Sequence, residues 1–276
     1  MKINYLCPIW GNELPFDDFV GRVKQAGFDG IEMSLPIDDD SAKHRMIKSI
    51  FDADLFFVGQ HWETVTVDFG EHKQEYIRRL HNLADGNPLL IDSQTGKDFF
   101  TFEQNMELVK LAHAFTKETG VHVVHETHRG KFTFAAHITE QFLLADPNLR
   151  IGSDFSHWCN VAESLLDNQE SALNLAISRA DHIHARVGFS EGPQIPDPRA
   201  AEWTDVLNKH LSWWDRIVDR ARKEGREFLC ITPEFGPYPY MTILPYSKLP
   251  IASQWDINVF MMNLLRNRYQ AKADAV

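Results

Sequence analysis

Cysteine, long apolar runs and basic side chains are all scarce in this sequence of 276 residues. The three cysteines, Cys7, Cys159 and Cys230, lie far apart and form no C-x-x-C pair, which excludes a disulfide scaffold and favours buried thiols in a reducing compartment. No apolar run reaches the ~18 residues of a membrane span, and the first residues lack the pattern of a secretory signal. We therefore expect a cytoplasmic protein that does not act in a membrane.

The shortage of basic residues limits the partners. Asp and Glu number 39 against 28 Lys and Arg, so the net charge is −11 with neutral histidines. An acidic surface of this kind repels a phosphate backbone, and we expect no nucleic-acid partner. With 43% hydrophobic and 24% charged residues, the composition is typical of a folded globular protein.

Short β-like runs alternate with amphipathic segments along the chain. The runs are rich in Val, Ile, Leu and Phe, as expected of parallel strands buried on both faces. They cover residues 3–6, 30–33, 55–60, 89–91, 121–126, 150–154, 182–186 and 227–232. Apolar residues recur at helical spacing between them, as Phe16, Phe19 and Val23 do. Eight strand–helix repeats without a break in composition predict an α/β protein with one domain over residues 1–276, a single (β/α)₈ TIM barrel.

Two long loops interrupt this pattern. Residues 187–200 are rich in glycine and proline, and residues 233–250 are rich in proline and tyrosine. As the loops after the seventh and eighth strands, they would lie over the C-terminal face of the barrel, where barrel enzymes carry their active sites. An open doubly wound sheet is the alternative, but the chain has neither a G-x-G-x-x-G motif nor a P-loop.

Metal-type ligands stand at four consecutive strand ends, about one strand–helix unit apart. They are Glu126, Asp154, His184 and Glu234. Because side chains alternate along a strand, all four can face the barrel interior. Three carboxylates at one point repel one another unless a cation lies between them. The set suits one divalent metal ion, Mn²⁺, Zn²⁺, Co²⁺ or Mg²⁺.

Two other motifs match a pattern but not its context. The stretch 188–192 reads G-x-S-x-G, yet prolines follow it in place of the helix that a nucleophile elbow requires. The stretch 125–128 resembles a zinc-protease motif, but Arg129 stands where the second histidine is needed. A serine hydrolase and a zinc protease are therefore disfavoured.

Aromatic residues and further histidines surround the expected site in sequence. Trp10, Trp62 and Trp158 follow the first, third and sixth strands, where aromatic faces suit a sugar, although capping of the barrel explains them equally well. Among the remaining histidines, His210 falls in a helical segment and is expected at the surface. The apolar run at 261–265 is read as helix core or as a patch for a second copy, which leaves a homodimer open.

Four stretches, 125–130, 154–158, 181–186 and 232–237, resemble the xylose isomerase-like barrel superfamily, the sugar phosphate isomerase/epimerase group. The order Glu, Asp-x-x-His, His-x-His, Glu carries the resemblance. It implies that Glu126, Asp154, His184 and Glu234 hold one divalent metal. In the ketose 3-epimerases of this group, the glutamates matching Glu126 and Glu234 form the acid/base pair that moves a proton through an enediolate.

The resemblance also implies substrate contacts. His157 stands in the Asp-x-x-His position, and Arg186 and Arg129 would bind hydroxyls or a carboxylate. The expected substrate-binding set is His157, Arg186, Arg129, His128, Trp10, Trp62, Trp158 and His61. The chain departs from the epimerases because its arginine comes two residues after His184, with a long loop behind it, which leaves the substrate open.

We therefore expect a metal-dependent isomerase or epimerase of a keto-sugar or related polyol, with that small molecule as its partner. A dehydratase of a keto-polyol, resembling inosose dehydratase, is the alternative. A nuclease resembling endonuclease IV is less favoured, because it needs several zinc ions, extra histidines of which only His61 is a candidate, and a basic groove.

Overall fold

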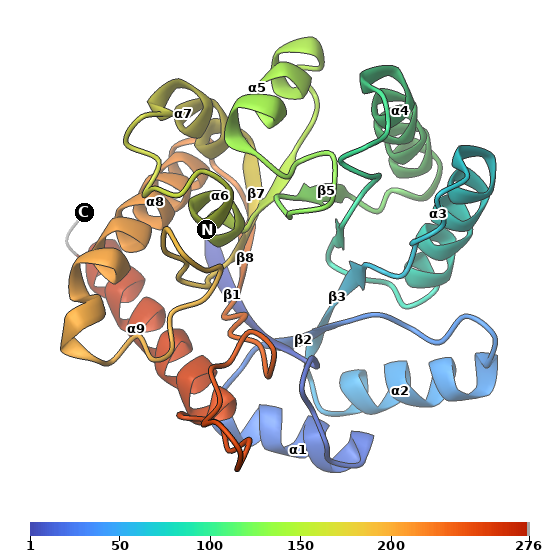
Figure 1. Ribbon diagram of the computed structural model, residues 1–276. Helices are drawn as coiled ribbons and strands as arrows, with labels where there is room; N and C mark the ends of the chain where they lie inside the picture. The colour runs from blue at the N-terminus through green and yellow to red at the C-terminus, as the bar shows by residue number, and fades with distance from the viewer. Residues whose placement is uncertain (275–276) are drawn as a thin grey trace.

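Eight parallel strands form a closed barrel, each paired with the next along the chain and β1 paired with β8, and helices surround it (Figure 1). This computed structural model describes residues 1–274, with side chains up to Ala271. The (β/α)₈ fold predicted from the strand–helix repeats is confirmed. No helix among the described residues is long and apolar enough to cross a membrane.

The strands are short, as barrel strands are. They are β1 (Lys2–Pro8), β2 (Gly30–Met33), β3 (Phe56–His61), β4 (Ile91–Ser93), β5 (Val123–Glu126), β6 (Ile151–Ser153), β7 (Ala180–His184) and β8 (Phe228–Thr232). The helices are α1 (Phe16–Ala26), α2 (Asp40–Asp52), α3 (Phe69–Ala84), α4 (Phe102–Thr119), α5 (Ala136–Ala145), α6 (Phe155–Val161), α7 (Glu170–Arg179), the 3₁₀ turn η1 (Ala201–Trp203), α8 (Thr204–Lys223) and α9 (Gln254–Asp274).

Most strand boundaries differ from the sequence prediction by one or two residues, and two of these differences affect residues of the site. The strand predicted at 89–91 is assigned instead to Ile91–Ser93, although Leu89 and Leu90 already make backbone hydrogen bonds to β3 just before it. The strand predicted at 182–186 starts earlier and ends at His184, so Arg186 lies beyond it.

Local signals in the sequence set the helix ends. Gly27 follows α1 with φ 88°, a left-handed conformation that glycine adopts without strain, and its N–H bonds back to the carbonyls of Val23 and Lys24. At α4, Thr101 and Gln104 form a reciprocal capping box. Such caps determine the residues at which each helix begins and ends.

The inside of the barrel changes character along the strands. A small apolar cluster of Leu6, Val58, Leu90, Val124 and Cys230 fills its lower part. Two residues further along their strands the same inward face turns polar, with Gln60 opposite Asp92 in register and Glu126 opposite Gly152. The polar groups therefore gather toward the C-terminal ends of the strands.

A larger apolar core lies between the barrel and the helices. His210 packs against Trp213 and Trp214 of this core, so its expected surface position is wrong: the residue is 1% exposed and its ring accepts a hydrogen bond from the Gly188 N–H at 3.2 Å. In the run at 261–265, Met261, Met262 and Leu265 are buried in this core and present no surface patch. The three cysteines are free and buried.

The two long loops contact each other. Gly236 donates its N–H to Oε1 of Gln194 at 2.7 Å, and the amide of Gln194 donates to the Gly236 carbonyl at 3.2 Å. Residues from 187–200 and 233–250 are thus fixed side by side next to the C-terminal ends of β7 and β8.

Candidate metal centre

Four side chains converge at the C-terminal ends of β5, β6, β7 and β8. Glu126, Asp154, His184 and Glu234 each offer one ligand atom, and these atoms lie within 4.8 Å of one another. Nδ1 of His184 is 2.9 Å from Oε2 of Glu234 and 3.7 Å from Oε1 of Glu126. Asp154 caps the N-terminus of α6 through the Ser156 N–H, which holds its carboxylate at the strand end. The four ligand candidates from the sequence are brought together.

The residues present fit a divalent metal. Both carboxylate oxygens of Glu126 are buried and have no hydrogen-bond partner among the described residues. A buried carboxylate oxygen without a partner is unfavourable, and a cation bound there removes the penalty. Three carboxylates and one imidazole also form a donor set that Mn²⁺, Co²⁺, Mg²⁺ and Zn²⁺ accept.

The pKa values of the two glutamates in the cluster are shifted in opposite directions. Burial and the nearby carboxylates of Glu234 and Asp154 outweigh the attraction of His184 and raise the pKa of Glu126 to about 7. Burial also raises the pKa of Glu234, but the attraction of His184 and Arg186 outweighs it and lowers the pKa to about 2. A pair of carboxyl groups held apart in this way is typical of acid/base sites.

Arg186 ties the cluster to the pocket above it. Its Nη2 donates to Oδ2 of Asp154 and lies 3.2 Å from Oε2 of Glu234, while its Nε donates to the Ser156 hydroxyl at 3.2 Å. Its Nη1 is buried without a hydrogen-bond partner among the described residues. The guanidinium therefore compensates part of the negative charge and keeps one donor group unused.

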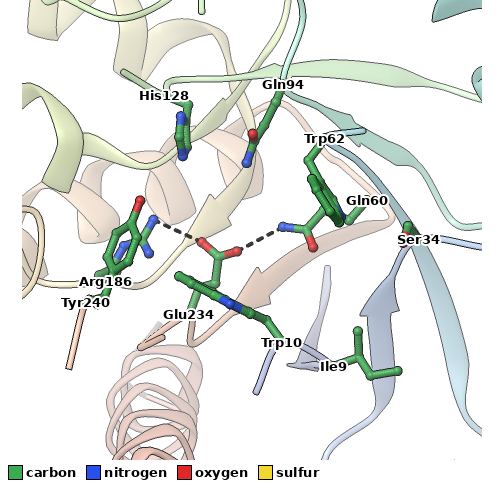
Figure 2. A pocket seen from close by; sticks show the side chains of 10 residues that line it. All are labelled: Ile9, Trp10, Ser34, Gln60, Trp62, Gln94, His128, Arg186, Glu234 and Tyr240. Atoms are coloured by element: carbon green, nitrogen blue, oxygen red, sulfur yellow. Dashed lines mark hydrogen bonds and ion pairs between the residues drawn. The ribbon is translucent and has the colours of Figure 1, made fainter. Parts of the chain in front are cut away.

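A pocket of about 410 Å³ opens over this cluster (Figure 2). Its lining residues are Ile9, Trp10, Ser34, Gln60, Trp62, Gln94, His128, Arg186, Glu234 and Tyr240. Glu234 lies between two of its neighbours there: Gln60 donates to its Oε1 at 2.9 Å, and Arg186 faces its Oε2. Of the four ligand candidates only Glu234 lines the pocket, and Glu126 is fully buried behind it.

Four of the expected substrate-binding residues line this pocket: Trp10, Trp62, His128 and Arg186. Nδ1 of His128 lies 2.7 Å from the carbonyl of Arg129 and must donate to it, which leaves Nε2 without a proton in the neutral ring. Burial and the positive Arg186 lower the pKa of His128 to about 3, so the ring is neutral at physiological pH.

Two further expected residues lie one step behind the lining. His157 is fully buried, and its Nε2 is 3.0 Å from Nη2 of Arg186. The guanidinium of Arg129 lies 5.1 Å from the ring centroid of Tyr240 and donates to the Asn160 side chain. Both therefore support pocket side chains instead of lining the pocket.

Trp158 and His61 are not brought to the pocket. Trp158 is 1% exposed, packs on Phe155, and donates its indole N–H to the Thr133 carbonyl at 2.8 Å. His61 is fully buried, and its ring nitrogens meet the hydroxyls of Ser93 and Thr64 at 2.9 and 2.7 Å. The sequence prediction of substrate contact rested on their place after strand ends, which does not tell an inward side chain from one that turns into the core.

Sequence reasoning missed several polar residues at the site: Glu32, Gln60, Asp92 and Gln94. Alternation from Gly30 along the second strand would have marked Glu32 as inward-facing. Asp92 was missed because the predicted strand ended one residue before it.

No protein-family model and no curated protein matches the chain. Solved structures do. An L-ribulose 3-epimerase is 14% identical, with TM-score 0.64, over 100% of this chain and 99% of that one. A probable 3-DHS dehydratase, AsbF, from Bacillus anthracis is 18% identical, with TM-score 0.57, over 97% and 100%. Endonuclease IV from Thermus thermophilus is 11% identical, with TM-score 0.58, over 97% and 99%.

At these identities the likeness shows the fold. It is the barrel fold that the motifs led us to expect, and proteins of all three activities weighed from the sequence share it. A choice among the activities must therefore come from the side chains of the site.

Proposed function

We propose that this protein is a divalent-metal-dependent isomerase or epimerase of a keto-sugar or related polyol. One observation carries the proposal: Glu234 belongs to the four-residue ligand cluster and also lines the pocket. A carboxylate in that position can touch a bound metal and a bound substrate together. It also lies next to a cationic side chain, Arg186, and a hydrogen-bond donor, Gln60, which both stabilise its ionised form.

The chemistry follows from the charges in the cluster. Glu234, ionised at neutral pH, removes the proton from the carbon next to the substrate carbonyl. The unused Nη1 of Arg186 donates to the oxygen on which negative charge develops, giving an enediolate. In an epimerase the second glutamate of the cluster, Glu126, returns the proton on the opposite face once the reacting carbon reaches the cluster behind the pocket lining, which inverts the centre. When bound, the metal supplies a positive charge that polarises the carbonyl.

The pocket lining suits a polyol. Trp10, Trp62 and Tyr240 offer aromatic faces for the C–H groups of a sugar, and Gln60, Gln94 and His128 offer donors and acceptors for its hydroxyls.

A dehydratase uses the same first step. Removal of the proton next to a carbonyl also begins the loss of water from a keto-polyol, and the AsbF structure shares the fold. A nuclease is less well supported, because both ring nitrogens of His61 are engaged by hydroxyls and the net charge is −11.

The test is deuterium incorporation from D₂O into a panel of ketopentoses and ketohexoses by the metal-loaded protein. We expect one deuterium per turnover at the carbon next to the carbonyl, with a product of otherwise unchanged mass. Glu234→Gln should abolish the exchange, while Glu107→Gln, an equivalent change on the outer face of α4, should not. A product lighter by one water would establish the dehydratase, and full exchange in Glu234→Gln would refute the assigned proton transfer.

A further inference from the structure

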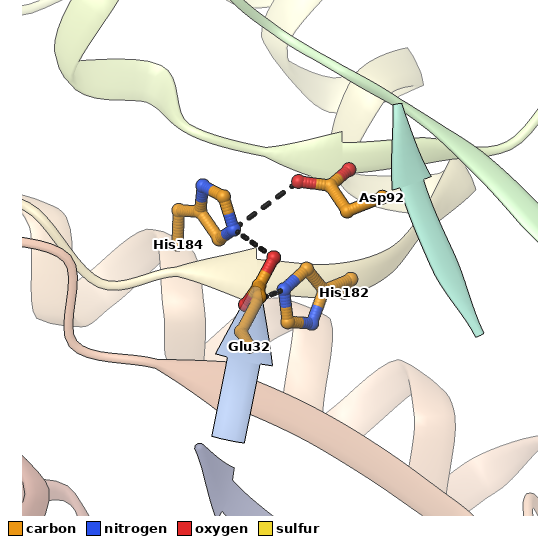
Figure 3. Close-up of side chains that lie close together, drawn as sticks. All are labelled: Glu32, Asp92, His182 and His184. Carbon is orange, nitrogen blue, oxygen red and sulfur yellow. Dashed lines mark hydrogen bonds and ion pairs between the residues drawn. The ribbon is translucent and has the colours of Figure 1, made fainter. Parts of the chain in front are cut away.

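A second cluster of ligand-type side chains lies one layer deeper in the barrel. Glu32 on β2, Asp92 on β4, and His182 and His184 on β7 offer ligand atoms within 4.8 Å of one another (Figure 3). All four side chains are at most 1% exposed. Apolar branched residues usually fill the inside of such barrels, so a buried polar layer here needs an explanation.

His184 belongs to both clusters through its two ring nitrogens. Nδ1 faces Glu234 and Glu126 in the upper cluster. Nε2 faces the lower cluster, 2.9 Å from Oε1 of Glu32 and 3.1 Å from Oδ2 of Asp92. One nitrogen carries at most one proton, so a single N–H cannot satisfy both carboxylates.

His182 poses the same difficulty. Its Nδ1 is 3.0 Å from the carbonyl oxygen of Cys230, which can only accept, so the proton of the neutral ring sits on Nδ1. Nε2 then turns its lone pair toward Oε2 of Glu32, 3.1 Å away. Two atoms that both carry lone pairs at this distance require a proton or a cation between them.

The burial of Asp92 is a second, independent observation that favours a cation in the lower cluster. The side chain is fully buried, and neither of its oxygens has a hydrogen-bond partner among the described residues. The neighbouring strand makes room for it: a Cβ at Gly152 would lie 2.2 Å from Oδ1 of Asp92. The backbone therefore makes room for the carboxylate, but its one ion-pair contact among the described residues is with Nε2 of His184, which Glu32 shares, and a partly compensated carboxylate is unfavourable in a dry interior.

The separations fit one small cation. Ligand atoms at the corners of a tetrahedral zinc site are about 3.3 Å apart, given metal–ligand bonds of about 2.0 Å. The contacts in the lower cluster are 2.9 Å and 3.1 Å. Two imidazole nitrogens and two carboxylates also form a softer donor set than the upper cluster, and such a set suits Zn²⁺.

We propose that Glu32, Asp92, His182 and His184 form a second divalent-cation site, with the imidazole of His184 bridging it to the upper one. Its Nδ1 would bind the upper ion and its Nε2 the lower, and the ring proton that binding displaces would pass to solvent. The two clusters hold five carboxyl groups against the one guanidinium of Arg186, an excess of acidic groups that favours a second divalent ion. This proposal goes beyond the proposed function and does not depend on its substrate.

The test is metal content per chain after saturation with Zn²⁺ or Co²⁺ and removal of free ion. We expect two ions in the wild type, one in Asp92→Asn and one in Asp154→Asn. Asp146→Asn is the matched control, since it changes a largely buried carboxylate that also faces a histidine, His113, and it should keep two. One ion in the saturated wild type, or two in Asp92→Asn, would overturn the proposal.

A spectroscopic measurement on the wild type covers the case in which Asp92→Asn does not fold. Two paramagnetic ions bridged by one imidazole are magnetically coupled, so the Cu²⁺-loaded protein should give the electron paramagnetic resonance of a coupled pair. The spectrum of isolated ions would contradict the bridge. The metal content of the two variants also tests the two sites separately. If an ion is lost in Asp92→Asn but not in Asp154→Asn, the upper site is contradicted. If an ion is lost in Asp154→Asn but not in Asp92→Asn, the lower site is contradicted.

Discussion

The indole of Trp10 meets the ring of Tyr240 edge-on, with 4.9 Å between the ring centroids. One comes from the loop after β1 and the other from the loop after β8, and both line the pocket. Gly236 packs directly against the indole: a Cβ there would lie 2.3 Å from a Trp10 ring carbon. The Trp10 ring can therefore occupy this position because residue 236 has no side chain.

Gly236→Ala should weaken substrate binding without affecting the metal centre. The added methyl group displaces the indole, and we expect KM to rise about tenfold, or about 1.4 kcal/mol, with kcat little changed. Steady-state kinetics on the active substrate measures it. Gly21→Ala is the matched control, because a Cβ there meets nothing within 4 Å. An unchanged KM in Gly236→Ala would show that the indole does not contact substrate.

Trp158→Phe should lower stability and leave KM unchanged. The indole N–H bond to the Thr133 carbonyl is lost in a fully buried site, and the smaller ring leaves a void, at about 1–3 kcal/mol together. Trp62→Phe should raise KM and leave the stability nearly unchanged, because that side chain is half exposed and lines the pocket. Urea unfolding and KM measured for both variants test whether Trp158 acts in stability and Trp62 in substrate binding. A raised KM with unchanged stability in Trp158→Phe would restore Trp158 to the substrate-binding set.

Chelation should lower the thermal stability of the wild type. Without a cation, the carboxylates of Glu126, Asp154 and Glu234 face one another within the buried cluster. A metal at a thousand times its Kd stabilises the folded state by about 4 kcal/mol, so the melting temperature should drop by several degrees and recover on refilling. Asp154→Asn should show a smaller change on chelation, since it has lost a ligand. Identical melting curves with and without chelator would contradict the metal site.

The fold could be predicted because its signals are local. Eight apolar runs separated by helical periodicity and glycine stops indicate a barrel, and a barrel brings the carboxyl ends of its strands together. Glu126, Asp154, His184 and Glu234 therefore converge as the spacing predicts.

Side-chain direction beyond a strand end could not be predicted in the same way. Trp158 lies in α6, which turns it into the core, and His61 meets hydroxyls from β4 and the loop that follows β3. Asp92 was missed because the predicted strand ended at residue 91, whereas the observed strand runs two residues further, to Ser93, and so includes Asp92. Contacts of this kind depend on strand register and loop geometry, which cannot be predicted from a single sequence.

Asp181 should make the protein sensitive to acid. The carboxylate is 1% exposed and contacts Arg226 at 2.7 Å, His122 at 3.1 Å and Arg220 at 3.3 Å. Burial raises its pKa, but the hydrogen bond from His122 and the attraction of Arg226 outweigh it and hold the pKa at about 2. An unfolded aspartate has a pKa of about 3.9, so the folded state binds the proton more weakly.

The sign of the effect follows from this difference. The stabilisation is fully present above about pH 4 and is lost as the pH falls through about 2, which amounts to roughly 2–3 kcal/mol. Urea unfolding measured at several pH values should therefore show a steeper loss of stability in the wild type than in Asp181→Asn, and Asp18→Asn, an exposed change on α1, should follow the wild type. Parallel curves for the wild type and Asp181→Asn would mean that the Asp181 ion pairs add no stability that depends on its charge.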